Sequence, residues 1–579
     1  MLNALISIQD ADPAGVDRAR AAMSAQGFML AATLRWNQGV IEGWTREGSG
    51  DGDNAILDSP SGRACAIGPM WYRTEFGRAA CEQILADHAA GSAIDEHELR
   101  GSFALFVQSN QGALLVNDPL GLVKIHSSAD GRFRSTSWLA TRAYGRSADI
   151  DEAAAIEYVL LGATHSERSV AAGVSHLALG EGFDLSGRRR FPRFSRGVGE
   201  GGERFADFDD AVAAFAAHFR NVSADIARAF PDRVNCALSG GFDSRLIVAG
   251  LLASGTRPHL FVYGSPGTSD VRIASEVATS QRLALDVIDK DVLERARREP
   301  DLADIVANTL FFDGLPNDGV LDSGVDRDTR LRQCADGAIA LNGGGGEILR
   351  NFFHLPDRSF TSLDVVRAFY RGFDAGVFRR RSGLNDYQES LAASIDASIS
   401  AAGLPSANRS GRYSREQIEL VYPLFRCHHW MGLNNSVAVR YGQFATPLVD
   451  LTLVRDACLL PLRWKNAGRF EARLIAALHP SIASEPSAYG FSFDKGPGFR
   501  GHANEWATLC RPVSARPMIS AARRALRDAR VPRTLVDRWR SMLPGEWRLD
   551  GVLDLERLPD RSSFSRALGV EVVSRELGR

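Results

Sequence analysis

One short stretch limits what this chain can fold into more than any other feature. In VNCALSGGFDSRLIVAG, a strand-like run over 234–238 enters two glycines, and an apolar helix is expected from Ser244 to Ala253. A turn between a strand and a helix start presents free backbone N–H groups and the positive end of the helix dipole to an anion. Gly240 and Gly241 let the backbone approach that anion closely. The stretch therefore predicts a phosphate-binding loop.

The loop differs from the two common glycine-rich nucleotide motifs. It matches neither G-x-x-x-x-G-K-[ST] nor G-x-G-x-x-G. Asp243 is the informative residue, because a carboxylate beside a phosphate is repelled unless a cation such as Mg²⁺ lies between them. The hydroxyls of Ser239 and Ser244 can add hydrogen bonds to the phosphate. The alternative is a tight structural turn, which would need neither the aspartate nor both serines.

Strands and helices alternate on both sides of this loop. The pattern predicts strands at 234–238, 259–263, 284–289 and 338–342 and helices at 207–229, 244–253 and 269–281. We expect Ser269 or Asp270 to cap the last of these helices. Residues 360–480 look mostly helical. Alternation at this spacing is typical of a doubly wound parallel sheet, an α/β fold.

The first part of the chain has a different pattern. Short alternating strands run from Ala4 to about Phe191, and GSFALFVQSNQGALLVNDPLG reads as two strands joined by the turn at 109–112. A chain of 579 residues is too long for one ordinary core. The sequence predicts a first domain over 1–190, a Gly- and Arg-rich linker over 191–206, a second domain over 207–510 and an arginine-rich helical extension over 511–579.

Composition excludes several classes of function. The formal net charge is −2, so no basic field attracts nucleic acid or an anionic membrane, and we expect neither as a partner. No apolar run is long enough to cross a bilayer, and the start lacks a signal-peptide pattern, so a cytoplasmic protein is expected. The seven cysteines are widely spaced without a C-x-x-C pair, which argues for reduced thiols and against a zinc site.

The motif S-G-G-x-D-S after a strand resembles the pyrophosphate loop of the ATP pyrophosphatase superfamily. Further stretches are similar to the asparagine synthetase group: LFVYGSPGTSDVRIASEVA, ALNGGGGEIL, FATPLVD and LPLRWKNAGRFEARLIAALHPSIASEPSAYGFSF. LRGSFALFVQSNQGALLVNDPLGLVKIHSSADGRFRSTSW resembles the glutaminase-type half of the same enzymes. The resemblance covers about residues 95–500. It implies an Ntn-hydrolase-like α+β sandwich over 1–190, followed by a parallel-sheet ATP pyrophosphatase synthetase domain.

The resemblance implies that the chain uses ATP and Mg²⁺. The residues that it places at ATP are Leu238, Ser239, Gly240, Gly241, Phe242, Asp243, Ser244, Val262, Tyr263, Gly264, Asn342 and Gly343. Asp243 and Glu347 are the implied Mg²⁺ ligands, since Glu347 fills the position of an aspartate in the family's acidic turn. The family's first carboxylate of that turn corresponds to Gly344 here. Alternatively, Glu347 caps the helix that follows.

The family's lysine, in R-x-K-x-G-F, has no counterpart in the aligned PSAYGF. Only four residues of the chain are lysines, and Lys495 is the nearest, so it is the candidate for neutralising pyrophosphate; the alternative is a solvated loop lysine. Lys465 matches a family lysine that we expect to be structural. His428 and His429 lie on a helical run at 417–437, and either is a candidate base for the attacking amine. A buried, hydrogen-bonded histidine is the alternative.

Residue 2 is Leu where the family's glutaminases have a nucleophilic Cys. The chain in this respect resembles β-lactam synthetases and lasso peptide cyclases, which join a carboxylate and an amine of one substrate. We expect a lasso peptide cyclase that adenylates an Asp or Glu side chain of a precursor peptide and joins it to the N-terminal amine. A leader peptidase and a leader-binding protein are then implied partners. Alternatives are a β-lactam or asparagine-forming synthetase and a nucleotide-binding regulator without turnover.

Overall fold

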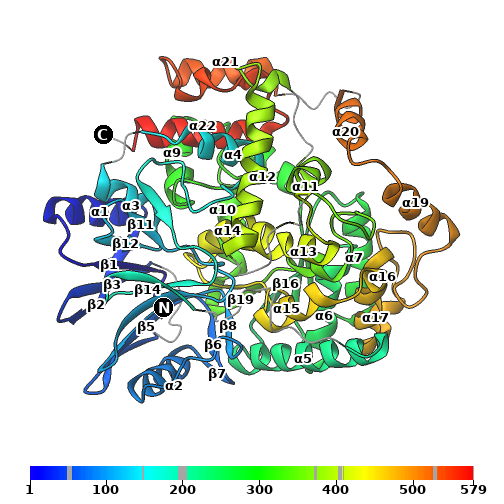
Figure 1. The fold of residues 1–579 in the computed structure, drawn as a ribbon, viewed down its shortest axis with the longest axis horizontal. Helices are drawn as coiled ribbons and strands as arrows, with labels where there is room; N and C mark the ends of the chain where they lie inside the picture. Colours follow the sequence, from blue (N-terminus) through cyan, green and yellow to red (C-terminus); the bar gives the residue numbers. More distant parts are fainter. Residues whose placement is uncertain are drawn as a thin grey trace.

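The computed structural model of the chain describes residues 1–47, 55–146, 149–193, 205–370, 375–401, 407, 410–525 and 531–577. Most of the predicted linker at 191–206 lies outside these residues. Among the described residues, no helix is both long enough and apolar enough to cross a membrane. The described residues form a mixed α/β structure, in which antiparallel sheets come first and a parallel sheet follows (Figure 1).

The first part of the chain forms two six-stranded antiparallel sheets. One has the order β13 (Val174–His176), β11 (His126–Ser128), β12 (Phe133–Ser135), β1 (Ala4–Ile8), β3 (Gly39–Arg46), β2 (Phe28–Trp36). The other has the order β15 (Arg189–Pro192), β14 (Glu181–Asp184), β10 (Gly112–Asn117), β9 (Ala104–Ser109), β5 (Gly62–Ile67), β4 (Ile56–Ser59). A small sheet of β7 (Glu75–Phe76), β6 (Met70–Tyr72) and β8 (Leu99–Gly101) and the helices α1 (Pro13–Ala25), α2 (Gly77–Ala89), α3 (Trp138–Gly145) and α4 (Glu152–Leu161) complete this part.

These two sheets pack face to face, with helices outside them. Because side chains alternate along a strand, Leu5 enters the core between the sheets while Ile6 packs with residues of α1 and α3. In the same way, Phe106 faces the core between the sheets and Leu105 packs with α2. The predicted hairpin is confirmed, since Ser109 pairs with Gly112 at its end. The resulting layers are helix, sheet, sheet and helix.

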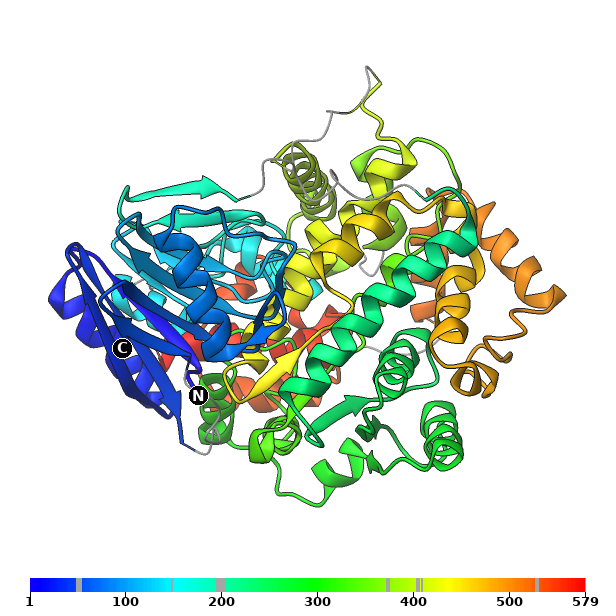
Figure 2. The same ribbon diagram turned by 90° about the horizontal axis from the view of Figure 1, so that it is seen from below.

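The second part is built on a five-stranded sheet in which every pairing is parallel. Its order is β18 (Leu285–Ile288), β17 (His259–Tyr263), β16 (Val234–Ala237), β19 (Ile339–Leu341), β20 (Gln443–Ala445). The predicted parallel sheet is therefore confirmed, and β20 is an addition, because 360–480 was expected to be mostly helical. Buried residues of β19 and β20 share a core cluster with both antiparallel sheets, which lie beside this part in Figure 2.

The second part also contains many helices. In chain order they are α5 (Phe208–Ala229), α6 (Phe242–Ala253), α7 (Ser269–Gln281), α8 (Lys290–Arg295), α9 (Leu302–Phe311), α10 (Val325–Gln333), η1 (Ala335–Gly337), η2 (Gly346–Leu349), α11 (Ser362–Phe369), η3 (Ala375–Val377), α12 (Gly383–Ala401), α13 (Arg415–Glu419), η4 (Tyr422–Met431), α14 (Gly432–Ala438), α15 (Leu451–Leu459), α16 (Leu462–Lys465), η5 (Asn466–Gly468), α17 (Arg469–Leu478) and α18 (Pro480–Ser484). Helix η4 is a π-helix. Helices α5, α6 and α17 pack against one another.

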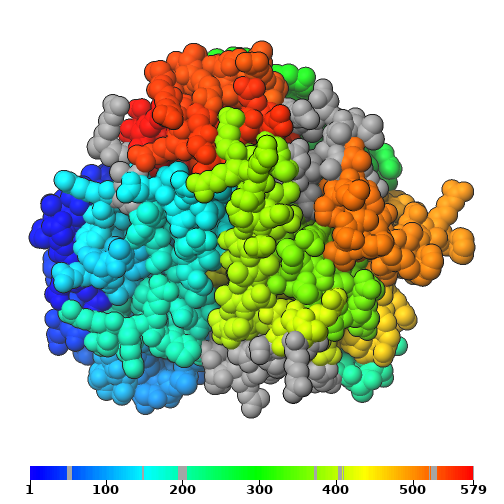
Figure 3. Space-filling view, turned by 45° about the horizontal axis from the view of Figure 1, so that its top comes forward, coloured from blue at the N-terminus to red at the C-terminus, as the bar shows by residue number. Residues whose placement is uncertain are grey.

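The C-terminal segment begins at Phe499 and is helical, as predicted for residues 511–579. It comprises α19 (Phe499–Leu509), α20 (Ala515–Ala525), α21 (Arg533–Met542), η6 (Arg548–Gly551), η7 (Leu555–Arg557) and α22 (Arg561–Arg575). Helix α22 is buried along most of its length and packs against α4 and α9, so it joins the two parts of the molecule. In Figure 3 the last part of this segment, with α21 and α22, lies at one end of the molecule, whereas α19 and α20 extend to the side.

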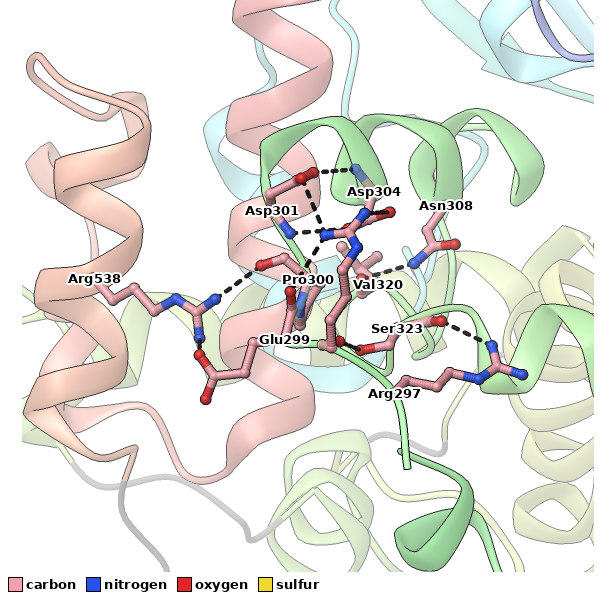
Figure 4. A network of polar contacts seen from close by, with 10 residues as sticks. Arg297, Glu299, Pro300, Asp301, Asp304, Asn308, Val320, Ser323 and Arg538 are labelled. Carbon is pink, nitrogen blue, oxygen red and sulfur yellow. Dashed lines mark hydrogen bonds and ion pairs between the residues drawn. The ribbon is translucent and has the colours of Figure 1, made fainter. Parts of the chain in front are cut away.

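A network of polar contacts ties α21 to the chain that precedes α9 (Figure 4). Arg538 pairs with Glu299, and its Nη2 donates to the carbonyl of Pro300 at 2.9 Å. Asp301 and Asp304 form a reciprocal cap on the first turn of α9. The network therefore fixes the C-terminal segment to an inserted loop of the second part.

Candidate active site

The order in which the chain adds strands to the parallel sheet reverses between β16 and β19. The chain runs from β16 outward through β17 to β18 and then returns to β19 on the opposite side of β16. The loops that leave two such neighbouring strands diverge, and the crevice between them is where α/β sheets bind ligands. The predicted phosphate loop follows β16, and the glycine turn at 342–346 follows β19. The two sequence motifs therefore meet at the switch point.

The glycine turn lies directly against the start of α6. A Cβ on Gly343 would lie 2.9 Å from the backbone N of Ser244, and a Cβ on Gly346 would lie 2.6 Å from Oδ1 of Asp243. Any larger side chain would push the turn away from the loop. The close approach brings Glu347 near Asp243, and burial, with the charge of Glu347, raises the pKa of Asp243 to about 6.

No side chain caps the start of the helix that follows the phosphate loop. Helix α6 begins at Phe242, two residues earlier than predicted, so Asp243 and Ser244 lie in its first turn. Its N-cap, Gly241, provides no side-chain cap. The hydroxyl of Ser244 accepts a hydrogen bond from the backbone N of Ser239 at 3.0 Å, which closes the turn. A helix start without a capping side chain is suited to an anion, so the loop fits a phosphate group.

Two distant segments hold the loop in place. Oδ1 of Asp270 accepts a hydrogen bond from the backbone N of Gly240 at 3.0 Å. The expectation that Ser269 or Asp270 caps α7 is wrong, since the N-cap is Thr268 and Asp270 reaches across to the loop instead. On the other side, the N–H of Ala488 donates to the carbonyl of Gly240 at 2.9 Å. Residue 488, where the resemblance would place a lysine, thus lies on the loop but carries only a methyl group.

An arginine that the sequence did not single out lies among the carboxylates. Nη2 of Arg350 is 2.6 Å from Oδ1 of Asp243, and its Nε is 3.0 Å from Oε2 of Glu471. Its Nη1 donates to the hydroxyl of Tyr489 at 3.2 Å. Burial and the neighbouring Asp243 raise the pKa of Glu471 well above its ordinary value. In the sequence, the one indication that Arg350 belongs to the site is its position three residues after Glu347.

The residues present fit a Mg²⁺ ion only together with a nucleotide. Within the described ranges, no three His, Cys, Asp or Glu side chains are placed to hold a metal ion by themselves. Asp243 and Glu347 offer two carboxylates beside a loop suited to phosphate. Mg²⁺ is usually held by one or two carboxylates with phosphate oxygens and water. The donor set therefore fits Mg²⁺ that arrives with a polyphosphate.

A cavity of about 530 Å³ opens at the same edge of the sheet. Its lining comes from the ends of four strands and from α10, η4 and α14, and includes Tyr263, Asn342, Gly344, Glu347, Arg426 and Thr446. Asp326 pairs with both Lys290 and Arg330 on one wall, where Nε of Arg330 is 2.7 Å from Oδ2 of Asp326. Together with Arg426, Asp318 and Glu347, the charged side chains of the lining are three positive and three negative.

The remaining residues predicted at ATP divide into two groups. Tyr263 and Asn342 line the cavity, and the hydroxyl of Tyr263 accepts from Gln333 at 2.6 Å. In contrast, the side chains of Leu238, Phe242 and Val262 are buried in the core, where Phe242 stacks on Phe493. Gly264 follows β17, and its N–H donates to the carbonyl of Ile288. The second group therefore supports the site through backbone and packing.

The π-helix η4 supplies a tyrosine that reaches the turn. The hydroxyl of Tyr422 donates to Oε2 of Glu347, which also accepts from the backbone N of Gly345 at 3.3 Å. Tyr422 is buried, and burial raises its pKa well above the ordinary value. Irregular helical turns of this type are frequent at functional sites. Tyr422 was missed because its partner is 75 residues away in sequence.

The two candidate histidines lie elsewhere. His428 and His429 are buried, belong to the same π-helix and do not line the cavity. They face His165 and His176, with the rings of His428 and His176 5.7 Å apart. Nζ of Lys124 lies 3.2 Å from a ring nitrogen of His428, and burial lowers the pKa of both imidazoles well below the ordinary value. The structure therefore supports the buried alternative.

In the described part of the chain, none of the four lysines bonds to a residue of the phosphate loop. Lys465 is fully buried and its Nζ is 2.5 Å from Oε2 of Glu419, so the structural role expected for it is confirmed. Lys290 pairs with Asp326 on the cavity wall. Lys495 is exposed, and within the described residues its side chain makes no hydrogen bond or ion pair. The structure does not bring it to Asp243, where the cation present is Arg350.

Neither a comparison of the chain with protein-family models nor a search of curated proteins found a match.

Proposed function

We propose that this chain is an ATP-dependent, AMP-forming amide ligase of the asparagine synthetase type. The observation that carries the proposal is the meeting of Asp243 and Glu347 at the switch point of the parallel sheet. One carboxylate comes from a helix start suited to phosphate, and the other lines the 530 Å³ cavity beside it. This arrangement suits a nucleotide whose phosphates lie on the loop and an acceptor that lies in the cavity.

In the proposed reaction, the loop and the start of α6 bind the β and γ phosphates of ATP. Asp243 and Glu347 would hold Mg²⁺, which supplies positive charge to the leaving pyrophosphate. A substrate carboxylate oxygen bonds to the α phosphorus, and the bond from that phosphorus to the oxygen bridging the α and β phosphorus atoms breaks, so that pyrophosphate leaves. An amine nitrogen then attacks the acyl carbon, loses a proton and releases AMP, so that an amide remains.

The proposed substrate is a peptide that is closed into a macrolactam, as in a lasso peptide cyclase. Leu2 is fully buried, and a Cβ on Gly43 would lie 2.8 Å from its side chain. Residue 2 is therefore part of the core, which supports a ligase that takes no ammonia from glutamine. The cavity has the size of small-ligand sites, so it would hold the activated carboxylate and adjoining groups, beside Lys290 and Arg330 on one wall.

The first test is phosphorus NMR of the protein with ATP and Mg²⁺, with and without a leader-free peptide encoded beside its gene. The cyclase proposal expects AMP and pyrophosphate only with the peptide, and a peptide product that has lost one water. AMP formation with aspartate and ammonium instead would point to a small-molecule synthetase. If no substrate yields AMP, the chain is a nucleotide binder without turnover.

Asp243→Ala distinguishes an enzyme from a nucleotide-binding regulator. In an enzyme the substitution removes a Mg²⁺ ligand, so AMP formation should fall by at least about 100-fold, as for other groups that stabilise the transition state. The nearby Asp270→Asn serves as the matched control, because asparagine keeps the acceptor for Gly240 and should retain most of the activity. In a regulator, only nucleotide affinity would change.

A further inference from the structure

The phosphate loop faces more carboxyl groups than cations. Asp243, Glu347 and Glu471 lie near one another, and the cation among them is Arg350. Arg245, in the first turns of α6, is occupied elsewhere, since its guanidinium donates to the carbonyl of Glu485 at 3.0 Å. A bound polyphosphate would add further negative charge beside these carboxylates. The site therefore needs a cation that can reach the phosphates.

Arg350 is the residue placed to do this. It leaves η2 at its end, on the β19 side of the switch point, and crosses to the loop on the β16 side. Its side chain is 19 % exposed, so it is neither sealed in the core nor free in solvent. Its three contacts use Nη2, Nε and Nη1, the fork that binds phosphate through parallel hydrogen bonds.

The partners of Arg350 allow it to move. Asp243 would exchange the guanidinium for Mg²⁺ when the metal arrives with the nucleotide, because the same oxygen, Oδ1, holds Arg350 at 2.6 Å. Tyr489 follows Ala488, whose N–H donates to the carbonyl of Gly240, and the contact of its hydroxyl with Nη1 keeps the guanidinium near the loop. The move from Asp243 to the phosphates then changes the partner of Nη2.

We propose that Arg350 binds the β and γ phosphates of ATP and the departing pyrophosphate, and that Asp243 holds its guanidinium until Mg²⁺·ATP binds. This inference rests on the proposed function. It assigns to an arginine of the glycine turn the phosphate contact that Lys495 was expected to make. Metal binding at Asp243 and phosphate binding at Arg350 thereby become coupled events.

The test is isothermal titration calorimetry with pyrophosphate and, separately, with AMP, each with and without Mg²⁺. Arg350→Gln should weaken pyrophosphate binding in Mg²⁺ by about 10- to 100-fold, the loss expected for charge-assisted hydrogen bonds, and change AMP binding less than about twofold. Arg350→Lys should fall between the two. Arg78→Gln, which removes an exposed charge on α2, is the matched control and should bind as the wild type does.

A second measurement keeps the inference testable if Arg350→Gln folds poorly. Without metal, Asp243→Asn should strengthen pyrophosphate binding, because the carboxylate no longer competes for the guanidinium. This gain should shrink in the double variant with Arg350→Lys, whose ammonium lacks the fork geometry. Equal gains in both backgrounds, or unchanged pyrophosphate affinity in Arg350→Gln, would overturn the role of Arg350. If the wild type binds neither ATP nor pyrophosphate, the proposed function itself fails.

Discussion

At the scale of single residues, the chain treats its buried charges in two ways. Lys465 is paired with Glu419, and Arg350 with Asp243, so these charges are compensated by opposite ones. Lys124 is different, because the groups within hydrogen-bond distance of its Nζ include the ring nitrogens of His428 rather than a carboxylate. Burial lowers the pKa of Lys124 to about 7, although the charge of Asp118 opposes this. Such a lysine lowers the stability of the fold.

The cost of Lys124 predicts a dependence of stability on pH. Below pH 7 the ammonium is charged in both the folded and the unfolded chain, so the full penalty applies. Between about pH 7 and its ordinary pKa of 10.5, the unfolded chain alone holds the proton, and the penalty is lost as pH rises. Lys124→Met should therefore raise the free energy of unfolding by about 1–4 kcal/mol at pH 7, and the difference from the wild type should shrink toward pH 10.

Urea unfolding at several pH values between 6 and 10 measures this difference. Lys495→Met is the control, since Lys495 is exposed and its replacement should leave the free energy of unfolding unchanged at every pH. If the difference between Lys124→Met and the wild type stays constant over this range, Lys124 does not lose its proton on folding.

At the scale of elements, the sequence predicted what local patterns can specify. The strand at 259–263 and the helix at 269–281 agree with the structure residue by residue. Strand β20 was missed because three buried residues, Gln443–Ala445, are too short to show a period. The start of α6 was misjudged because its N-cap is a glycine rather than a capping side chain. The site residues missed, such as Glu471, contact the loop only through the tertiary fold.

The glycine turn predicts an effect that belongs to this scale. Gly343→Ala places a Cβ 2.9 Å from the backbone N of Ser244 and 3.1 Å from the carbonyl carbon of Asp243. Because backbone atoms cannot rotate away as a side chain can, the turn must move from α6. We expect a loss of about 1–3 kcal/mol in stability and loss of AMP formation, measured by thermal unfolding and pyrophosphate release.

Gly267→Ala is the matched control for this substitution, because no atom lies within 4 Å of its Cβ position. It should change neither stability nor turnover. Full AMP formation by Gly343→Ala would mean that the turn and the loop need not touch. The placement of Glu347 near Asp243 would then not be needed for activity.

At the scale of the whole molecule, the C-terminal helix α22 contacts both parts of the chain and the backbone of a residue that lines the cavity. Helix α22 packs against α4 of the first part and α9 of the second. Nε of Arg566 donates to the carbonyl of Val159 in α4 at 2.9 Å, and its Nη1 donates to the carbonyl of Asn317 at 2.9 Å. Asn317 and Asp318 line the cavity. The position of α22 therefore determines one wall of the proposed acceptor site.

Arg566→Ala tests this connection. It leaves two carbonyls without their donor and should lower the free energy of unfolding by about 2–4 kcal/mol. Arg538→Ala in α21, which removes a more exposed ion pair with Glu299, should cost less than about 1 kcal/mol. Since Asn317 belongs to the cavity and not to the phosphate loop, Arg566→Ala should raise the KM for the acceptor peptide more than the KM for ATP. Equal increases in both would show that α22 supports the fold as a whole rather than the acceptor wall.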